Sequence, residues 1–124
     1  MEHNQELFSY DLKCVRLLRE SEITFAGLID HMGKLVAGGF KHGISPSEDE
    51  AERRKMYLDI VLCASLRKDF DYSLGSVMYS ASRGEKAVMI NFLLGKRILL
   101  VTAEPDVDMD KTAQKIIRII HTYC

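Results

Sequence analysis

The sequence predicts an α+β protein in which one five-stranded antiparallel sheet carries helices on both faces. Three observations lead to this fold class. The apolar pattern changes along the chain in the order α-β-β-α-β-β-β-α, short turns join consecutive strands, and the last two strands are almost continuously apolar. Short turns force neighbouring strands to run antiparallel, and strands without a polar face need cover on both sides.

The first half of the chain predicts a helix followed by a β-hairpin. Apolar residues recur at steps of three and four over residues 5–19, which is typical of an amphipathic helix. A β-branched and aromatic run over residues 23–29 then leads through a four-residue turn into a second strand over residues 34–38. Gly33 ends that turn and can adopt the positive φ that such loops need.

The longest predicted helix follows an irregular glycine-containing stretch. Ser47 and Glu50 have the spacing of a capping box, in which each side chain satisfies a free backbone N–H of the other. No glycine or proline interrupts the helical pattern from there to about Phe70, and Gly75 is the expected stop. This helix is therefore expected to span roughly 20–25 residues, well above the average of about 11–12.

Three strands and a last helix complete the pattern. The strands are predicted over residues 76–82, 86–94 and 97–103, and the helix begins after Asp106 or Asp108. The second and third of these strands are apolar on both faces and should lie inside the sheet. We therefore expect the first and last helices on one face of the sheet and the long central helix on the other.

The composition of the chain indicates which classes of partner and which cellular compartment to expect. The 124 residues are 47% apolar, enough for one core, and 17 basic residues nearly cancel 18 acidic ones. A net charge of −1 argues against nucleic acid or an anionic membrane as partner, because both are bound through basic excess. Three cysteines without close spacing and no apolar leader favour the cytoplasm. We expect a single domain over residues 1–124.

Motifs for catalysis, cofactors and metals do not match the sequence. The glycines around residues 38–43 lack the lysine and hydroxyl of a phosphate-binding loop, and no G-x-S-x-G motif or closely spaced His or Cys pair occurs. The acidic residues at the start of the long helix fit a solvated helix terminus. We expect no enzyme activity, no cofactor and no metal.

The element order and two local stretches resemble the roadblock/LC7 domain, which has a profilin-like fold. The stretches are the hairpin over residues 25–39, with its double glycine Gly38-Gly39, and the strand-to-helix segment over residues 97–120. Both are still more similar to an uncharacterised family of short single-domain proteins of ammonia-oxidising archaea. The resemblance implies a homodimeric interaction or scaffold module whose partner is a small Ras-like GTPase or a larger protein.

A dimer interface is expected where the predicted sheet has a weakly defended edge. The strand over residues 77–82 carries small polar residues and no charge, so it can pair with another chain. In roadblock homodimers the corresponding strand and the long helix form the interface. The resemblance therefore implies five interface residues in this chain: Met56, Tyr57, Ile60, Met78 and Tyr79.

Two other functions remain open from the sequence. A sensor domain of the PAS or GAF type would bind a small ligand between the sheet and the long helix, in a cavity lined by Phe25, Met89 or Phe92. A small enzyme would need a cleft that holds titratable residues with shifted pKa values.

Overall fold

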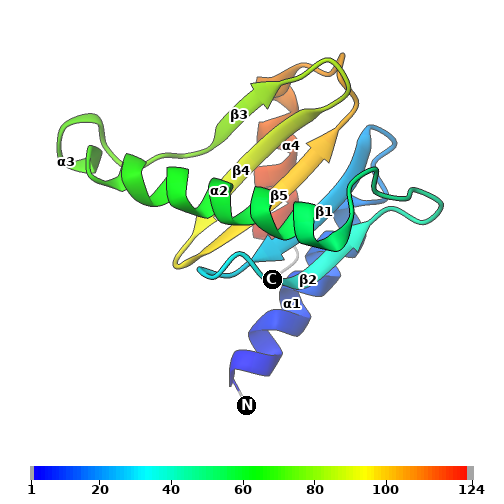
Figure 1. The fold of residues 1–124 in the computed structure, drawn as a ribbon, viewed down its shortest axis with the longest axis horizontal. Helices are drawn as coiled ribbons and strands as arrows, with labels where there is room; N and C mark the ends of the chain where they lie inside the picture. Colours follow the sequence, from blue (N-terminus) through cyan, green and yellow to red (C-terminus); the bar gives the residue numbers. More distant parts are fainter. Residues whose placement is uncertain (1, 123–124) are drawn as a thin grey trace.

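The computed structural model describes residues 2–122, which form one antiparallel sheet with helices on both faces (Figure 1). In chain order the elements are α1 (Glu2–Leu17), β1 (Ile23–Ile29), β2 (Leu35–Phe40), α2 (Glu50–Lys68), α3 (Asp71–Leu74), β3 (Ser80–Arg83), β4 (Val88–Leu94), β5 (Arg97–Ala103) and α4 (Met109–Thr122). The five strands lie in the order β2-β1-β5-β4-β3, and each neighbouring pair is antiparallel. The predicted fold class is confirmed.

The helices cover the two faces as predicted. Cys14 and Leu17 of α1 and Ile116 of α4 share one buried cluster with residues of β1, β4 and β5. On the other face, Tyr57 and Ile60 of α2 pack with the four buried side chains Phe25, Ile29, Ile98 and Leu100. Figure 1 shows α2 in front of the sheet, with α1 and α4 behind it.

The two apolar strands differ in how completely they are covered. β5 is the middle strand and is buried on both faces, as predicted. β4 is fully buried on one face only, because its alternate residues Met89, Asn91 and Leu93 are partly exposed. These three face α2, whose buried side chains pack over β1 and β5 instead. The prediction that β4 is buried on both faces is therefore wrong for the face below α2.

The start of α2 differs from the predicted capping box. Asp49 is the N-cap and its carboxylate accepts a 2.8 Å hydrogen bond from the Glu52 backbone N–H. The hydroxyl of Ser47 instead donates to the Glu48 carboxylate. The capping-box prediction is wrong by two residues, because a carboxylate at position 49 satisfies the free N–H groups of the first turn. At the other end, α2 stops at Lys68 and the one-turn helix α3 precedes Gly75.

The first hairpin follows the prediction closely. Gly33 has a φ of 76°, and the Asp30 carboxylate accepts hydrogen bonds from the backbone N–H groups of Met32 and Lys34, both at 2.9 Å. β2 runs two residues further than predicted, to Phe40. At Gly38 this strand comes so close to α1 that the Asp11 carboxylate accepts the Gly38 N–H at 2.9 Å. The helix thereby covers the edge of the sheet at this point of β2.

An ion-pair cluster links α1 and the connection between α1 and β1 to α4, and it makes stability pH-dependent. Lys115 Nζ lies 3.2 Å from a Glu20 carboxylate oxygen and 2.6 Å from one of Glu22. The pKa of Glu20 is lowered by its hydrogen bonds from Arg16 and Lys115, and the pKa of Glu22 is lowered chiefly by Lys115. Because both pKa values are lower in the folded state, the stabilisation is present above the ordinary pKa of 4.5 and is lost as the pH falls through the folded values.

Replacing Lys115 by methionine should reduce this pH dependence. We expect Lys115→Met to lower the free energy of unfolding by up to about 1 kcal/mol at about pH 7. The loss should be smaller at about pH 3, below the ordinary carboxyl pKa of 4.5, because the ion-pair stabilisation weakens as the pH falls. Urea unfolding of both proteins at the two pH values measures the difference. An equal loss at both pH values would show that the lysine acts through packing of its alkyl chain instead.

Candidate functional site

The two edges of the sheet are protected very differently. At one edge, α1 packs against β2, and the Asp11 carboxylate accepts a hydrogen bond from the Gly38 N–H. At the other edge, all four residues of β3 are exposed, and in the described part of the chain this strand pairs only with β4. An exposed strand edge offers a row of free N–H and C=O groups to a further strand. β3 is therefore the edge at which another chain can extend the sheet.

A projecting segment lies beside this open edge. Residues 69–79, which we call the arm, include α3 and connect α2 to β3, and Figure 1 shows α3 extending beyond the sheet. Three large side chains of the arm are unusually exposed for their type: Tyr72 is 88% exposed, Met78 74% and Leu74 70%. Several large exposed apolar side chains in one segment are typical of interaction sites on folded proteins.

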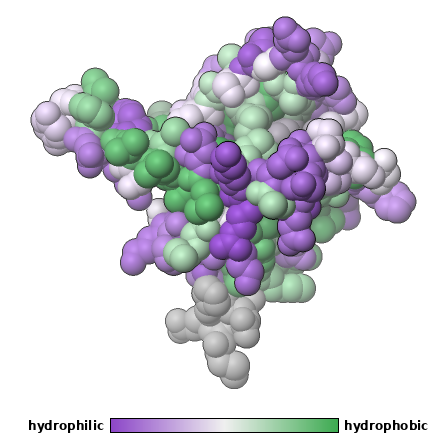
Figure 2. Space-filling view, in the orientation of Figure 1, coloured by the Kyte–Doolittle hydropathy of each residue, from purple (hydrophilic) through white to green (hydrophobic). Residues whose placement is uncertain are grey.

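A second exposed apolar feature runs along the outside of α2. Leu58, Leu62 and Leu66 are spaced four residues apart and are all exposed, so they form one row on the helix, which we call the outer stripe. Ile60 and Tyr57 point to the sheet, on the opposite side of α2. Figure 2 shows hydrophobic residues gathered along α2 and towards α3. Phe70, four residues further along in the arm, is also exposed.

The five residues predicted for the interface lie in three different environments. Tyr57 and Ile60 are buried in the chain's own core, and burial raises the pKa of the Tyr57 phenol. The Tyr79 hydroxyl donates to the Asp110 carboxylate at 2.5 Å, and the Tyr79 ring packs against Phe92. Met56 is partly buried beside the sheet. Met78 is the only one of the five whose side chain is mostly exposed.

Met78 and Tyr79 also lie outside the strand in which they are predicted, because β3 begins only at Ser80. The outer stripe is not among the predicted interface residues, because Met56, Tyr57 and Ile60, which were expected to face a partner, lie on the side of α2 that packs on the sheet. The repeat of apolar residues at positions 58, 62, 66, 70 and 74 could have revealed a second face.

A groove separates α2 from the sheet near the open edge. Its volume is about 460 Å³. Its walls are mostly apolar and are formed by Met56, Ile60, Cys63 and Ala64 of α2, by Val77 of the arm, and by Met89, Leu93 and Ile98 of the sheet. Asn91 also lines the groove, and its side-chain oxygen is buried without a hydrogen-bond partner.

Of the three residues suggested for the ligand cavity of a PAS-like sensor, one lines the groove and two do not. Met89 lines the groove, but Phe25 packs against Phe40, with ring centres 4.8 Å apart, and against Tyr57. Phe92 belongs to the buried cluster on the other face of the sheet. A space between the sheet and the long helix does exist, but it lies over β3 and β4 instead of over Phe25.

Two further features, a metal-binding cluster and a membrane-spanning helix, are not found among residues 2–122. Across residues 2–122, no three His, Cys, Asp or Glu side chains are grouped so that they could hold a metal ion. None of the helices in the described part of the chain is long and apolar enough to span a membrane.

This sheet, with α1 and α4 on one face and α2 on the other, is the fold of the roadblock/LC7 domains. A roadblock/LC7 domain from Streptomyces avermitilis superposes with a TM-score of 0.67 at 16% identity, over 90% of this chain and 92% of that one. Myxococcus xanthus MglB gives 0.63 at 12% identity, over 96% and 92%. The gliding protein MglB of Thermus thermophilus gives 0.61 at 16% identity, over 92% of each chain.

Within this fold class, the chain belongs to the family of unknown function DUF6659, whose model matches residues 3–122. No curated protein matches the sequence. A further solved structure with the same fold is an MglB with a tetrameric arrangement, at a TM-score of 0.59 and 18% identity, over 94% of this chain and 93% of that one.

Proposed function

We propose that the protein is a non-enzymatic interaction module that forms a homodimer through the β3 edge and presents a combined surface to a second protein. The observation that carries this proposal is the bare β3 edge beside the exposed arm, set against a β2 edge that the chain covers itself. The resemblance to roadblock domains and the tetrameric arrangement of one MglB support self-association.

The chemistry of β3 suits pairing with a second copy of itself. Ser80, Ala81 and Ser82 have small side chains, so another backbone can approach without a steric barrier. Arg83, the only charged residue of the strand, donates to the backbone oxygens of Pro105 and Val107 in its own chain. Two β3 strands related by a two-fold axis would run antiparallel and join two five-stranded sheets into one.

The arm adds apolar contact to this pairing. Because α3 extends past the β3 edge, the arm of each copy would lie over the sheet of the other (Figure 1). Met78 and Leu74 would then be removed from water, and burial of apolar surface is the main favourable term in association. Strand pairing would fix how the two copies are oriented, and the arm would add buried apolar surface. Together they would make a self-complementary interface.

The outer stripes of the two copies would form the surface for a further partner. Leu58, Leu62 and Leu66 do not face the sheet, so pairing at β3 leaves them accessible and doubles them across the two-fold axis. The resemblance to roadblock domains implies a small Ras-like GTPase as that partner. We propose such a GTPase, bound across both α2 helices.

Hydrogen–deuterium exchange tests the edge pairing. In a dimer, the outward-facing N–H groups of β3 donate to the second copy, so we expect their exchange to slow as the protein concentration rises from nanomolar to micromolar. The N–H groups of β5, in the middle of the sheet, serve as the internal control and should not change. Exchange of β3 at one fast rate at every concentration would contradict the proposed pairing.

A charge in the outer stripe tests the second partner. We expect Leu62→Asp to weaken binding of a nucleotide-loaded Ras-like GTPase encoded in the same genome by at least about 30-fold, because an apolar contact at the centre of an interface is worth about 2 kcal/mol or more. The mass of the protein in solution should stay unchanged. Loss of GTPase binding together with loss of the dimer would contradict the separate roles of the stripe and the edge.

A further inference from the structure

The groove below α2 results from small side chains on one half of the sheet. In the β-sheet register, Ser80 lies opposite Asn91 and Ser82 opposite Met89, and each pair shares the face below α2. The serines are too short to reach the helix, whereas Phe25 and Leu100 fill the corresponding space over β1 and β5. The missing volume, about 460 Å³, is within the range of about 300–1,000 Å³ found for small-molecule sites.

Asn91 is out of place in this apolar wall. It stands between Met89 and Leu93 on the same face of β4, where an apolar residue would complete the row. Among the side chains that the structure describes, Asn91 Oδ1 is the one buried polar atom that has no hydrogen-bond partner. Buried polar groups are nearly always paired, so an orphaned oxygen that lines a groove indicates a missing donor.

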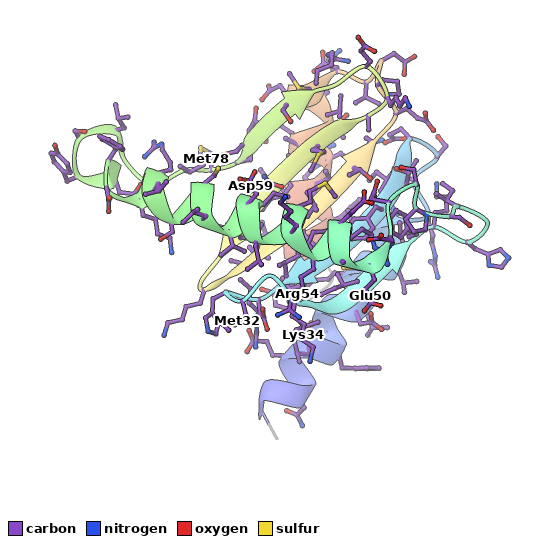
Figure 3. The ribbon with its side chains drawn as sticks, viewed as in Figure 1. Met32, Lys34, Glu50, Arg54, Asp59 and Met78 are labelled. Atoms are coloured by element: carbon purple, nitrogen blue, oxygen red, sulfur yellow. The ribbon has the colours of Figure 1, made fainter. Side chains whose placement is uncertain are left out.

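The charge of the groove further limits what can fill it. Asp59 and Arg67 of α2 are the charged residues that line it, and their opposite signs leave no net charge. Arg67 already pairs with Asp71 at 3.2 Å. Figure 3 shows Asp59 on α2, on the same side of the helix as Met78. A neutral, largely apolar occupant therefore fits better than an anion or a cation.

We propose that this groove binds a small neutral aromatic molecule that carries one N–H or O–H group, and that this group donates a hydrogen bond to Asn91 Oδ1. The apolar side chains Met56, Ile60, Met89 and Leu93 cover the ring, and Asn91 selects for the donor. Specificity of this kind is strong, because a ligand without the donor leaves the buried oxygen unpaired. The site does not require the β3 pairing, since all its walls belong to one copy.

Indole and 1-methylindole form a matched pair of probes, because methylation removes the N–H donor and otherwise adds only one methyl group. We expect indole to bind about tenfold more tightly than 1-methylindole, measured by NMR titration up to about 10 mM. Asn91→Leu should abolish this preference by weakening the binding of indole. The control Gln114→Leu changes an exposed residue of α4 and should leave both affinities unchanged.

A second variant keeps the test decisive if Asn91→Leu folds poorly. Ala64 of α2 is half-buried and lines the groove, so Ala64→Trp should fill the space and prevent binding of both probes. Equal affinities for the two probes, no binding of either, or unchanged binding to Ala64→Trp would overturn the proposal. So would dissociation of a dimer in step with indole binding, because a second copy would then be the occupant. A monomeric protein that still prefers indole would support this site and contradict only the dimer.

Discussion

Met78→Asp should convert the dimer into a monomer without unfolding the chain. Met78 is 74% exposed in the arm, so a carboxylate there is solvated in a single copy. In the dimer the same carboxylate would be buried against the second copy without a partner, and burying an unpaired charge is strongly unfavourable. We expect the dimer dissociation constant to rise by at least about 30-fold, measured by sedimentation equilibrium.

Met32→Asp is the matched control for this substitution. Met32 is also a methionine and is 56% exposed, but it lies in the β1–β2 turn, away from the β3 edge. Figure 3 shows Met32 and Met78 on opposite sides of α2. The control should change neither the dissociation constant nor, by more than about 0.5 kcal/mol, the free energy of unfolding. Equal weakening by both variants would mean that net charge, and not the arm, governs association.

Tyr79→Asp is a poor substitute for Met78→Asp, although both residues were predicted for the interface. The Tyr79 hydroxyl donates to Asp110, and this hydrogen bond raises the pKa of Tyr79. An aspartate at position 79 would place a second carboxylate near Asp110 and remove a ring that packs on Phe92. It would therefore disturb the fold of one copy as well as any contact between copies.

Gly38→Ala should cost more stability than any other glycine-to-alanine substitution in the described part of the chain. Gly38 has a φ of 77°, and a Cβ built there would lie 2.1 Å from the Ala26 carbonyl oxygen and 2.8 Å from Cys14 Sγ. Cys14 is fully buried, and burial raises the pKa of its thiol to about 12, so the surroundings are tightly packed. We expect a loss of about 2–5 kcal/mol in urea unfolding, from backbone strain and overpacking together.

Gly43→Ala separates the two causes of that loss. Gly43 also has a positive φ, 87°, but a Cβ built there would meet nothing within 4 Å. Gly43→Ala should therefore lower the free energy of unfolding by about 1 kcal/mol, from backbone strain alone. Similar losses for the two variants would show that α1 does not pack against β2 as closely as the structure indicates.

Much of the fold could be predicted, because the spacing of the apolar residues and the residue types in the turns indicate the same helices and strands. β1 was predicted with its observed bounds, since a β-branched run ends at an Asp30 turn with Gly33 at positive φ. The amphipathic pattern of α4 likewise corresponds to the buried face that contains Ala113 and Ile116. Local residue types determine these features, so no distant contact was needed to find them.

The candidate site was harder to predict because it depends on contacts between distant segments. Tyr57 and Ile60 resemble interface residues by type, but only the position of α2 over β1 and β5 shows that they face inwards. The groove depends on Ser80 and Ser82 lying opposite β4, which is a matter of strand register. The N-cap of α2 is Asp49 and not the predicted Ser47, because several residues in that stretch can cap a helix.

The molar mass in solution tests the central claim, that the open β3 edge pairs with a second copy. Light scattering on the protein eluting from a size-exclusion column, at micromolar concentration, measures this mass directly. Pairing at β3 predicts twice the chain mass of 14.1 kDa, about 28 kDa. A mass of 14.1 kDa at every micromolar concentration would contradict the claim.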